Sequence, residues 1–183
     1  IKYCLELSDA SALVFGPEFI GGVVEIIDRC AKVKNRFYVG DDCDVTIVAG
    51  CGINNCGTQE SRHDGIHSFF IGKNCKVKYI EKHYGEGDGR GTNVMNPTTI
   101  VELGEGSYME METTQIKGVD STVRTTHATV GPEATLIIKE KVMTHGKQLA
   151  KSDFTVDLNG DGCHTNVISR SVAKGESKQI FLA

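Results

Sequence analysis

The 183-residue sequence contains no tryptophan, only three prolines and no long apolar run. Its apolar stretches fall far short of the roughly 18 residues that a membrane-spanning helix needs, and no signal peptide is recognisable. Basic residues number 20 against 24 acidic ones, and they form no basic stripe. The sequence therefore argues against a membrane protein and against a nucleic-acid partner.

An even, regularly spaced set of cysteines, as found in small secreted disulfide scaffolds, is also missing. The chain has seven cysteines, an odd number. We therefore expect reduced thiols and a cytoplasmic protein. The sequence stops at Ala183 within a strand-like pattern, so we expect either a chain truncated at its C-terminus or an open edge that pairs with a second copy.

A short pattern does recur five times: an apolar residue, a glycine, a few polar residues and then alternating apolar positions. The five glycines are Gly40, Gly72, Gly104, Gly131 and Gly160, and they follow one another at a nearly constant interval. A period of about 30 residues with one turn signal per period is typical of repeat architectures. Because glycine can adopt a positive φ, we expect each of these glycines to form the corner between two strands.

The positions around each corner follow the period of a strand that buries one face. The third and first residues before the glycine, and the fifth and seventh after it, are mostly apolar. The third residue after the glycine is always small, as a tight corner stacked on its neighbour would need. These small residues are Cys43, Cys75, Ser107, Ala134 and Cys163, and we interpret the three cysteines as structural.

We therefore predict an all-β fold, a right-handed parallel β-helix (a solenoid) with coils of about 30 residues. A left-handed hexapeptide helix uses the same unit but repeats it in tandem and closes a coil in about 18 residues. A β-sandwich would not keep the small residues in register. In this interpretation residues 1–36 are a less regular N-terminal segment that leads into the solenoid, and residues 37–183 are the β-helix core.

Two thiols and two imidazoles lie close together after the first corner: Cys51, Cys56, His63 and His67. Thiolate and imidazole suit Zn²⁺ or iron, although this spacing is not that of a standard zinc finger. The alternative is a polar loop in which His67 is buried, because it has the inward parity of the strand before Gly72. Cys51 is a candidate reactive thiol in an exposed loop.

Three other motifs point to structure rather than chemistry. Residues 157–162 match the first half of a calcium loop, but position twelve of that loop is Ile168 instead of glutamate. The glycine-rich stretch 85–91 lacks a Gly-Lys-Ser/Thr motif and is expected to be a flexible excursion. Glu110 and Glu112 have the outward parity and are expected to form a solvated face.

Several of these segments resemble the SufB/SufD family. They are residues 49–51 (Ala-Gly-Cys), 63–67 (His-Asp-Gly-Ile-His), 69–75 (Phe-Phe-Ile-Gly-Lys-Asn-Cys) and 167–173 (Val-Ile-Ser-Arg-Ser-Val-Ala). The resemblance covers roughly residues 37–183. It implies a right-handed parallel β-helix that works in iron–sulfur cluster assembly, together with a SufC-like ABC ATPase, a second SufB/SufD chain and sulfur-donor proteins.

The resemblance also implies roles for individual residues. Cys51 occupies the Gly-Cys position associated with the acceptance of sulfur as a persulfide, and His63 and His67 match the adjoining loop. The family's downstream cluster-site residues and its C-terminal SufC-docking helices have no counterpart here. An iron–sulfur cluster is therefore expected only as a transient cargo, not bound in this fragment, and the resemblance leaves open whether the role is that of SufB or SufD.

Three functions remain open from the sequence. The first is a scaffold component without enzymatic turnover of its own. The second is a β-helix enzyme that acts on carbohydrate, which would need a carboxylate cluster or Ca²⁺ and aromatic residues that stack on sugars. The third is a structural fragment without activity.

Overall fold

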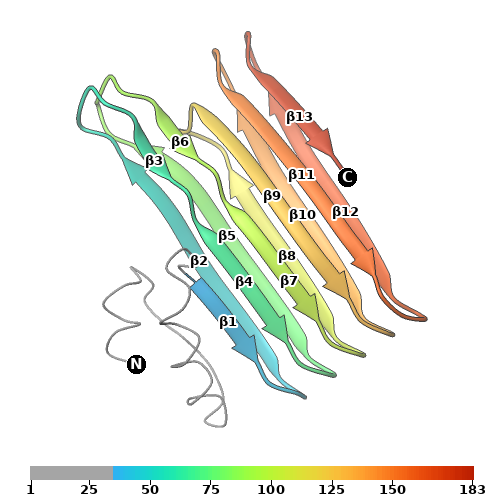
Figure 1. The fold of residues 1–183 in the computed structure, drawn as a ribbon. Helices are drawn as coiled ribbons and strands as arrows, with labels where there is room; N and C mark the ends of the chain where they lie inside the picture. Colours follow the sequence, from blue (N-terminus) through green and yellow to red (C-terminus); the bar gives the residue numbers. More distant parts are fainter. Residues whose placement is uncertain (1–34) are drawn as a thin grey trace, which may run out of the picture.

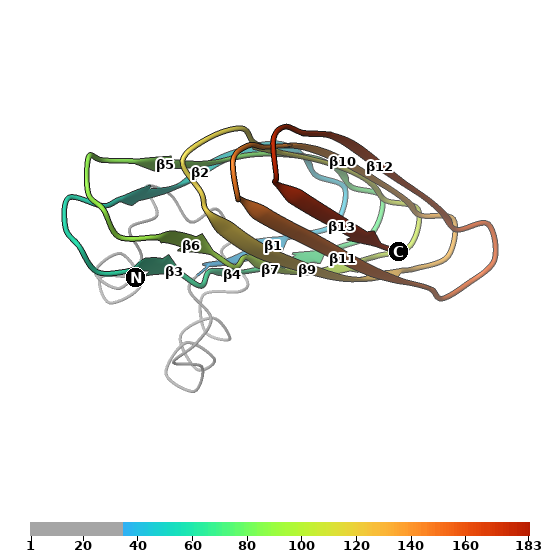
Figure 2. The ribbon, with the colours of Figure 1, turned by 90° about the horizontal axis from the view of Figure 1, so that it is seen from above.

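The computed structural model describes residues 35–183, and these residues form two sheets of parallel strands (Figure 1). One sheet has the order β1 (Asn35–Val39), β4 (Ile66–Ile71), β7 (Thr98–Leu103), β9 (Ser121–Val130), β11 (Leu149–Leu158) and β13 (Lys178–Leu182), extended by β3 (Ser61–His63) and β6 (Asn93–Met95). The other has the order β2 (Asp44–Asn54), β5 (Lys76–Glu86), β8 (Tyr108–Gln115), β10 (Thr135–Thr144) and β12 (His164–Ala173). The chain alternates between the two sheets, which lie face to face when seen from above (Figure 2).

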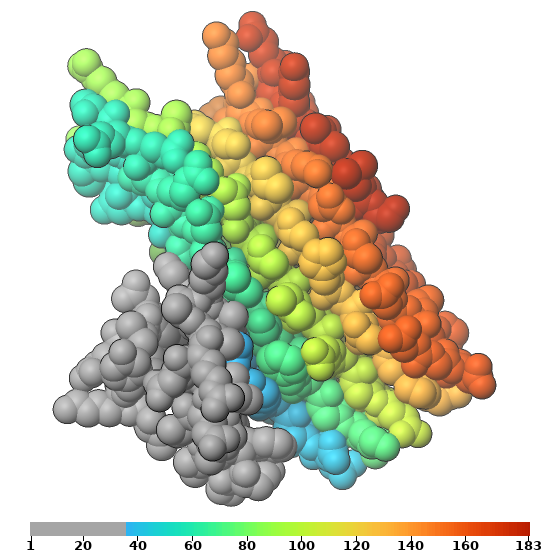
Figure 3. All heavy atoms as spheres, in the orientation of Figure 1, coloured from blue at the N-terminus to red at the C-terminus, as the bar shows by residue number. Residues whose placement is uncertain are grey.

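The strand register follows the sequence repeat. Asn35 pairs with His67, and Thr98 pairs with Thr125, so each residue lies beside its counterpart in the next repeat of the chain. On the surface the coils appear as diagonal stripes that succeed one another in chain order (Figure 3). The predicted all-β fold, a parallel solenoid with coils of about 30 residues, is therefore confirmed. The expected less regular segment, residues 1–36, lies almost wholly outside the described residues.

Residues 35–183 contain no helix, and thus no helix long and apolar enough to cross a membrane.

The corners differ from the sequence prediction in one respect. At the first four corners the residue with positive φ is not the motif glycine but the second residue after it, as Asn74 (φ 54°) and Glu133 (φ 53°) show, whereas Gly160 at the fifth corner has a positive φ itself. The motif glycine is required by stacking instead. A Cβ on Gly104 would lie 2.5 Å from the carbonyl oxygen of Gly72 on the preceding coil, closer than any Cβ can approach. The glycine column thus allows one coil to lie directly on the next.

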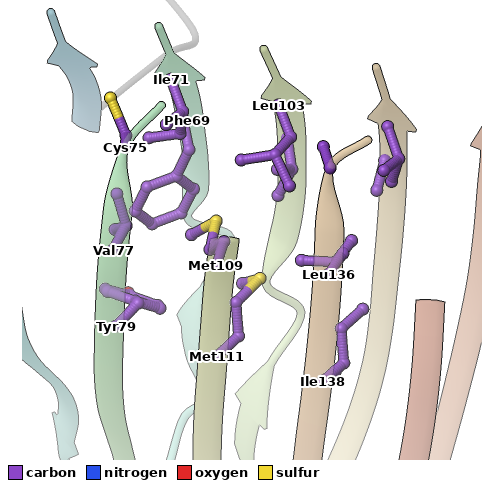
Figure 4. Close-up of a cluster of buried hydrophobic side chains, with 14 of the residues drawn as sticks. Phe69, Ile71, Cys75, Val77, Tyr79, Leu103, Met109, Met111, Leu136 and Ile138 are labelled. Atoms are coloured by element: carbon purple, nitrogen blue, oxygen red, sulfur yellow. The ribbon is translucent and has the colours of Figure 1, made fainter. Parts of the chain in front are cut away.

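The apolar core fills the space between the sheets next to these corners. Its side chains come from both layers and point toward one another (Figure 4). Phe69 stacks on Phe37 at a ring distance of 4.7 Å, and Tyr79 meets Phe69 edge-on at 4.6 Å. The buried members are Phe69, Ile71, Cys75, Val77, Tyr79, Val101, Leu103, Met109, Met111, Ala128, Val130, Ala134, Leu136, Ile138 and Phe154.

The glycine-rich stretch 85–91 is joined to the coil before it, rather than leaving the stack as expected. The amide of Gly89 donates to the carbonyl of Asn55, and the amides of Arg90 and Gly91 donate to that of Gly57. This turn therefore closes the end of the coil opposite the corners.

Candidate thiol site inside the solenoid

The inward face of β5 changes from apolar to polar along the strand. Val77 belongs to the apolar core, and Tyr79, Glu81 and His83 follow at every second position. All of them are buried, Glu81 with only 1% of its surface exposed. Strand geometry sends these alternating side chains into the same interior space. Because buried polar groups need partners, this half of the interior must hold a hydrogen-bonded cluster.

Cys51 joins that cluster from the adjacent strand. β2 continues to Asn54 through its pairing with β5, and Cys51 lies opposite His83 in this register. Its side chain is half-buried and packs against an apolar group that includes Ile53 and Met95. The expectation that Cys51 lies in an exposed loop is therefore wrong, because the strand extends further than the sequence pattern suggested.

Cys51, His67 and Glu81 meet at the centre of the cluster. Cys51 Sγ lies 3.9 Å from Nε2 of His67 and 3.6 Å from Oε1 of Glu81. The other ring nitrogen of His67, Nδ1, lies 3.0 Å from the same Glu81 oxygen. It also lies 3.0 Å from the Tyr79 hydroxyl. The thiol, the imidazole and the carboxylate thus form a triangle in which each group contacts the other two.

The charge state of Glu81 follows from its contacts. Burial alone would raise the pKa of Glu81, but the imidazoles of His67 and His83 lower this pKa well below its usual range. The side chain is therefore an ionised carboxylate. The nearest oxygen, Oε1, lies 3.0 Å from Nε2 of His83 as well as from His67.

His83 differs from His67 in what faces its second nitrogen. Arg124 Nη2 lies 2.6 Å from Nδ1 of His83. A guanidinium can only donate, so this nitrogen must be unprotonated and accept. Burial, together with the Arg124 charge, lowers the pKa of His83 despite the neighbouring Glu81. His83 is thus neutral, with its proton on Nε2.

Arg124 extends the polar cluster to the following coils. Its Nη1 forms a buried ion pair with Oε1 of Glu140 at 2.9 Å. Glu140 also accepts hydrogen bonds from the hydroxyls of Ser152, at 2.6 Å, and Ser169, at 3.0 Å. The cluster therefore runs through the interior from Cys51 on β2 to Ser169 on β12.

Comparison with known proteins identifies the family to which this solenoid belongs. The family described as "SUF system FeS cluster assembly, SufBD core domain" matches residues 31–183. The chain belongs to the SufBD family. The resemblance seen in the sequence is thereby confirmed, and the family acts in iron–sulfur cluster assembly.

One curated relative is the "Iron-sulfur cluster assembly SufBD family protein" of Archaeoglobus fulgidus (strain ATCC 49558 / DSM 4304 / JCM 9628 / NBRC 100126 / VC-16). It is 24% identical over 144 residues, which cover 79% of this chain and 37% of the relative. The chain thus spans little more than a third of the length of that protein. No solved structure matches this SufBD core.

The residues singled out in the sequence do not all come together. The SufBD core brings Cys51 and His67 into one cluster. Cys56 is exposed, with its Sγ 3.3 Å from Oδ1 of Asn54, and His63 is half-buried on β3. Cys75 is buried at a corner as predicted, with Cys43 and Cys163 packed against the core at either end.

The two surface carboxylates also face outward, as their positions in the alternation of the strand predicted. Glu110 and Glu112 face outward on β8 and lie within ion-pair distance of Lys78, at 3.5 and 3.7 Å. Glu110 also pairs with Lys139 at 2.7 Å. This salt-bridged, solvated face needs no ligand to account for it.

The interior cluster contains three side chains of the kinds that ligate metal ions. Cys51, Glu81 and His83 each offer one ligand atom, and these atoms lie within 4.8 Å of one another. Sulfur, oxygen and nitrogen ligands suit Zn²⁺ or Fe²⁺. However, Nε2 of His83 carries the proton while Arg124 occupies Nδ1, which opposes ligation by this histidine. One cysteine is also too few for the thiolate ligation of an iron–sulfur cluster.

Most members of this cluster have no recognisable motif around them in the sequence. Glu81, His83, Arg124 and Glu140 are each a common charged or polar residue, so motif spacing does not predict them. A signal was nevertheless present. Glu81 and His83 continue the inward parity of Val77 and Tyr79, and charged residues on a buried parity are rare enough to be noticed.

Proposed function

We propose that this SufBD core belongs to a scaffold component of a SUF-type iron–sulfur cluster assembly complex, and that it accepts sulfur on Cys51. The observation that carries the proposal is the setting of Cys51. Its thiol is half-buried at 3.9 Å from an imidazole, inside a family domain of cluster assembly. Thiols that react selectively are found beside such basic groups, whereas structural cysteines lie in apolar surroundings.

The corner cysteines give the contrast within the same chain. Cys75 is buried, and its Sγ contacts the backbone carbonyl oxygens of Gly40 and Lys73, at 2.9 and 3.3 Å. No charged side chain is near its thiol in these contacts. The described part of the chain therefore contains inert structural thiols and a thiol in a polar cluster, and the second is the candidate for chemistry.

The proposal includes partners and a cargo. The proposed partners are a SufC-like ABC ATPase, a second SufB/SufD chain and sulfur-donor proteins in the cytoplasm. The iron–sulfur cluster is a transient cargo in this view, and the protein is a scaffold rather than an enzyme with turnover. Interior Cys51 would take sulfur first, and the cluster itself would form elsewhere in the assembled complex.

The test is persulfide loading followed residue by residue. The protein is incubated with a cysteine desulfurase and cysteine, alkylated, digested and analysed by mass spectrometry. We expect one added sulfur atom on Cys51, loss of this signal in Cys51→Ser, and its retention in Cys56→Ser. Equal loading of wild type and Cys51→Ser would contradict the assignment and favour the structural fragment.

A further inference from the structure

We propose that Cys51, His67 and Glu81 form a thiol-activating triad, in which His67 takes the proton of the Cys51 thiol and Glu81 holds the imidazole in the tautomer that can do so. This inference rests on the proposed function, because attack on a sulfur donor requires a thiolate rather than a thiol. Each member comes from a different strand: Cys51 from β2, His67 from β4 and Glu81 from β5.

The contacts of His67 fix its tautomer. Its Nδ1 lies 3.0 Å from both the Glu81 carboxylate and the Tyr79 hydroxyl. Burial raises the pKa of Tyr79, so the phenol keeps its proton. A lone pair on Nδ1 would face the ionised Glu81 carboxylate at 3.0 Å, which is unfavourable, so we place the proton of the neutral imidazole on Nδ1. Nε2 is left with a lone pair, and this nitrogen is the one at 3.9 Å from Cys51 Sγ.

His83, the second histidine of the cluster, cannot accept the proton of the Cys51 thiol. Nδ1 of His83 already accepts from Arg124 at 2.6 Å, and Nε2 carries the proton. His83 therefore has no lone pair to offer a thiol. Of the two imidazoles around Glu81, only His67 can act as the base.

The transfer of the proton leaves the net charge of the cluster unchanged. When the thiol proton moves to Nε2 of His67, a neutral pair becomes a thiolate and an imidazolium side by side. Glu81, whose Oε1 lies 3.0 Å from Nδ1 of the ring, stabilises the imidazolium by its negative charge. The groups that face the pair are Tyr79, Glu81 and His83 of β5, Arg124 of β9 and, behind it, Glu140 of β10.

The proposed step is a transfer of sulfane sulfur from a protein cysteine persulfide. The Cys51 thiolate attacks the terminal sulfur of the donor persulfide, so that a new S–S bond forms on Cys51 while the S–S bond of the donor breaks. The cysteine sulfur of the donor leaves as a thiolate and takes the proton held by His67. Electrons and protons balance, and no oxidant is consumed.

The test measures thiolate reactivity with iodoacetamide, which needs no persulfide. The alkylation of Cys51 is followed by peptide mass spectrometry between pH 5 and 10, with Cys56 as the internal reference thiol. In His67→Gln we expect the rate at Cys51 to fall at least about tenfold at pH 7 and to recover at high pH, because the thiolate then forms without a base. His127→Gln, a change at an exposed histidine of β9, should leave the profile unchanged.

Glu81→Gln distinguishes two roles of the carboxylate that would change the alkylation rate of Cys51 in opposite directions. Cys51 Sγ lies 3.6 Å from Glu81 Oε1, so a carboxylate that acted on the sulfur directly would disfavour the thiolate, and its removal would speed alkylation. A carboxylate that acts through His67 stabilises the imidazolium, and its removal slows alkylation severalfold at pH 7. We expect the slower reaction, and faster alkylation would overturn the role of Glu81.

If the variants do not fold, the wild-type protein still tests the proposal. In the wild type we expect Cys51 to reach its maximal alkylation rate at a lower pH than Cys56. An unchanged profile in folded His67→Gln, or a Cys51 profile in wild type that is not displaced below that of Cys56, would overturn the triad. The outcome is separate from the proposed function: absent persulfide on Cys51 with an intact triad profile would refute sulfur acceptance alone.

Discussion

Removal of Arg124 should destabilise the fold far more than removal of a surface charge that lies at a similar distance from its partner. Arg124 and Glu140 form an ion pair at 2.9 Å, with 6% and 2% of their side chains exposed. In Arg124→Met the Glu140 carboxylate keeps the hydroxyls of Ser152 and Ser169 but loses its cation. Breaking a buried pair from one side costs about 3–5 kcal/mol, because the remaining charge stays buried.

The assay is urea unfolding followed by circular dichroism, with a double-mutant cycle. Glu140→Gln in the Arg124→Met background removes the unpaired charge, so we expect the double variant to recover about 2–3 kcal/mol relative to the sum of the single changes. The comparison holds where the slope of the unfolding free energy with urea is unchanged. In a solenoid, whose coils contact only their neighbours, this condition must be checked for each variant.

The matched control is Lys73→Met. Lys73 and Glu105 lie 2.8 Å apart across a corner, but 61% and 54% of their side chains are exposed. Solvent screens such a pair, so its loss should leave the urea midpoint unchanged within error. If Arg124→Met had no larger effect than Lys73→Met, the buried ion pair would not be a determinant of the fold, and our account of the interior would be wrong.

Two further predictions concern the stacked coils, each with a control in the same protein. Phe69→Ala removes a fully buried ring that packs on the core and should cost about 3–5 kcal/mol in urea unfolding, whereas Val48→Ala, at a side chain 73% exposed, should cost little. Gly104→Ala places a methyl group 2.5 Å from the Gly72 carbonyl oxygen and should lower the thermal midpoint clearly, while Gly50→Ala meets nothing within 4 Å and should not. Equal effects within either pair would contradict the packing described here.

The sequence predicted the fold through features that act within one coil. Alternating apolar residues and one small residue at each corner suffice to indicate stacked parallel strands, and the burial of Cys75, Ser107 and Ala134 agrees with this interpretation. The predicted positive φ of the motif glycine is found at Gly160 but not at the other four corners. Close contact with the preceding coil, rather than a positive φ, requires Gly104, and such a contact depends on a second segment that lies one repeat earlier in the chain.

The candidate site could be predicted only in part for the same reason. Cys51 and His67 were visible as thiol and imidazole near one another in the sequence. Which groups meet them depends on register: Glu81 comes from β5, the strand paired with that of Cys51, and Arg124 reaches His83 across 41 residues. A pattern search based on apolar periodicity passes over charged residues, so the buried charges emerge only once the coils are stacked.

The position of the buried charges is itself an argument for chemistry at Cys51. A solenoid of this kind can fill its interior with apolar side chains, as it does beside the corners. At the other end of the same strands it buries two carboxylates and one guanidinium. Ion pairs of this type are often less stabilising than apolar residues of similar volume, so stability gives no reason for them. Their arrangement does give one: Glu140 fixes Arg124, Arg124 fixes the tautomer of His83, and His83 helps to keep Glu81 ionised behind His67. The chain of contacts ends at the Cys51 thiol, whose Sγ lies 3.9 Å from Nε2 of His67.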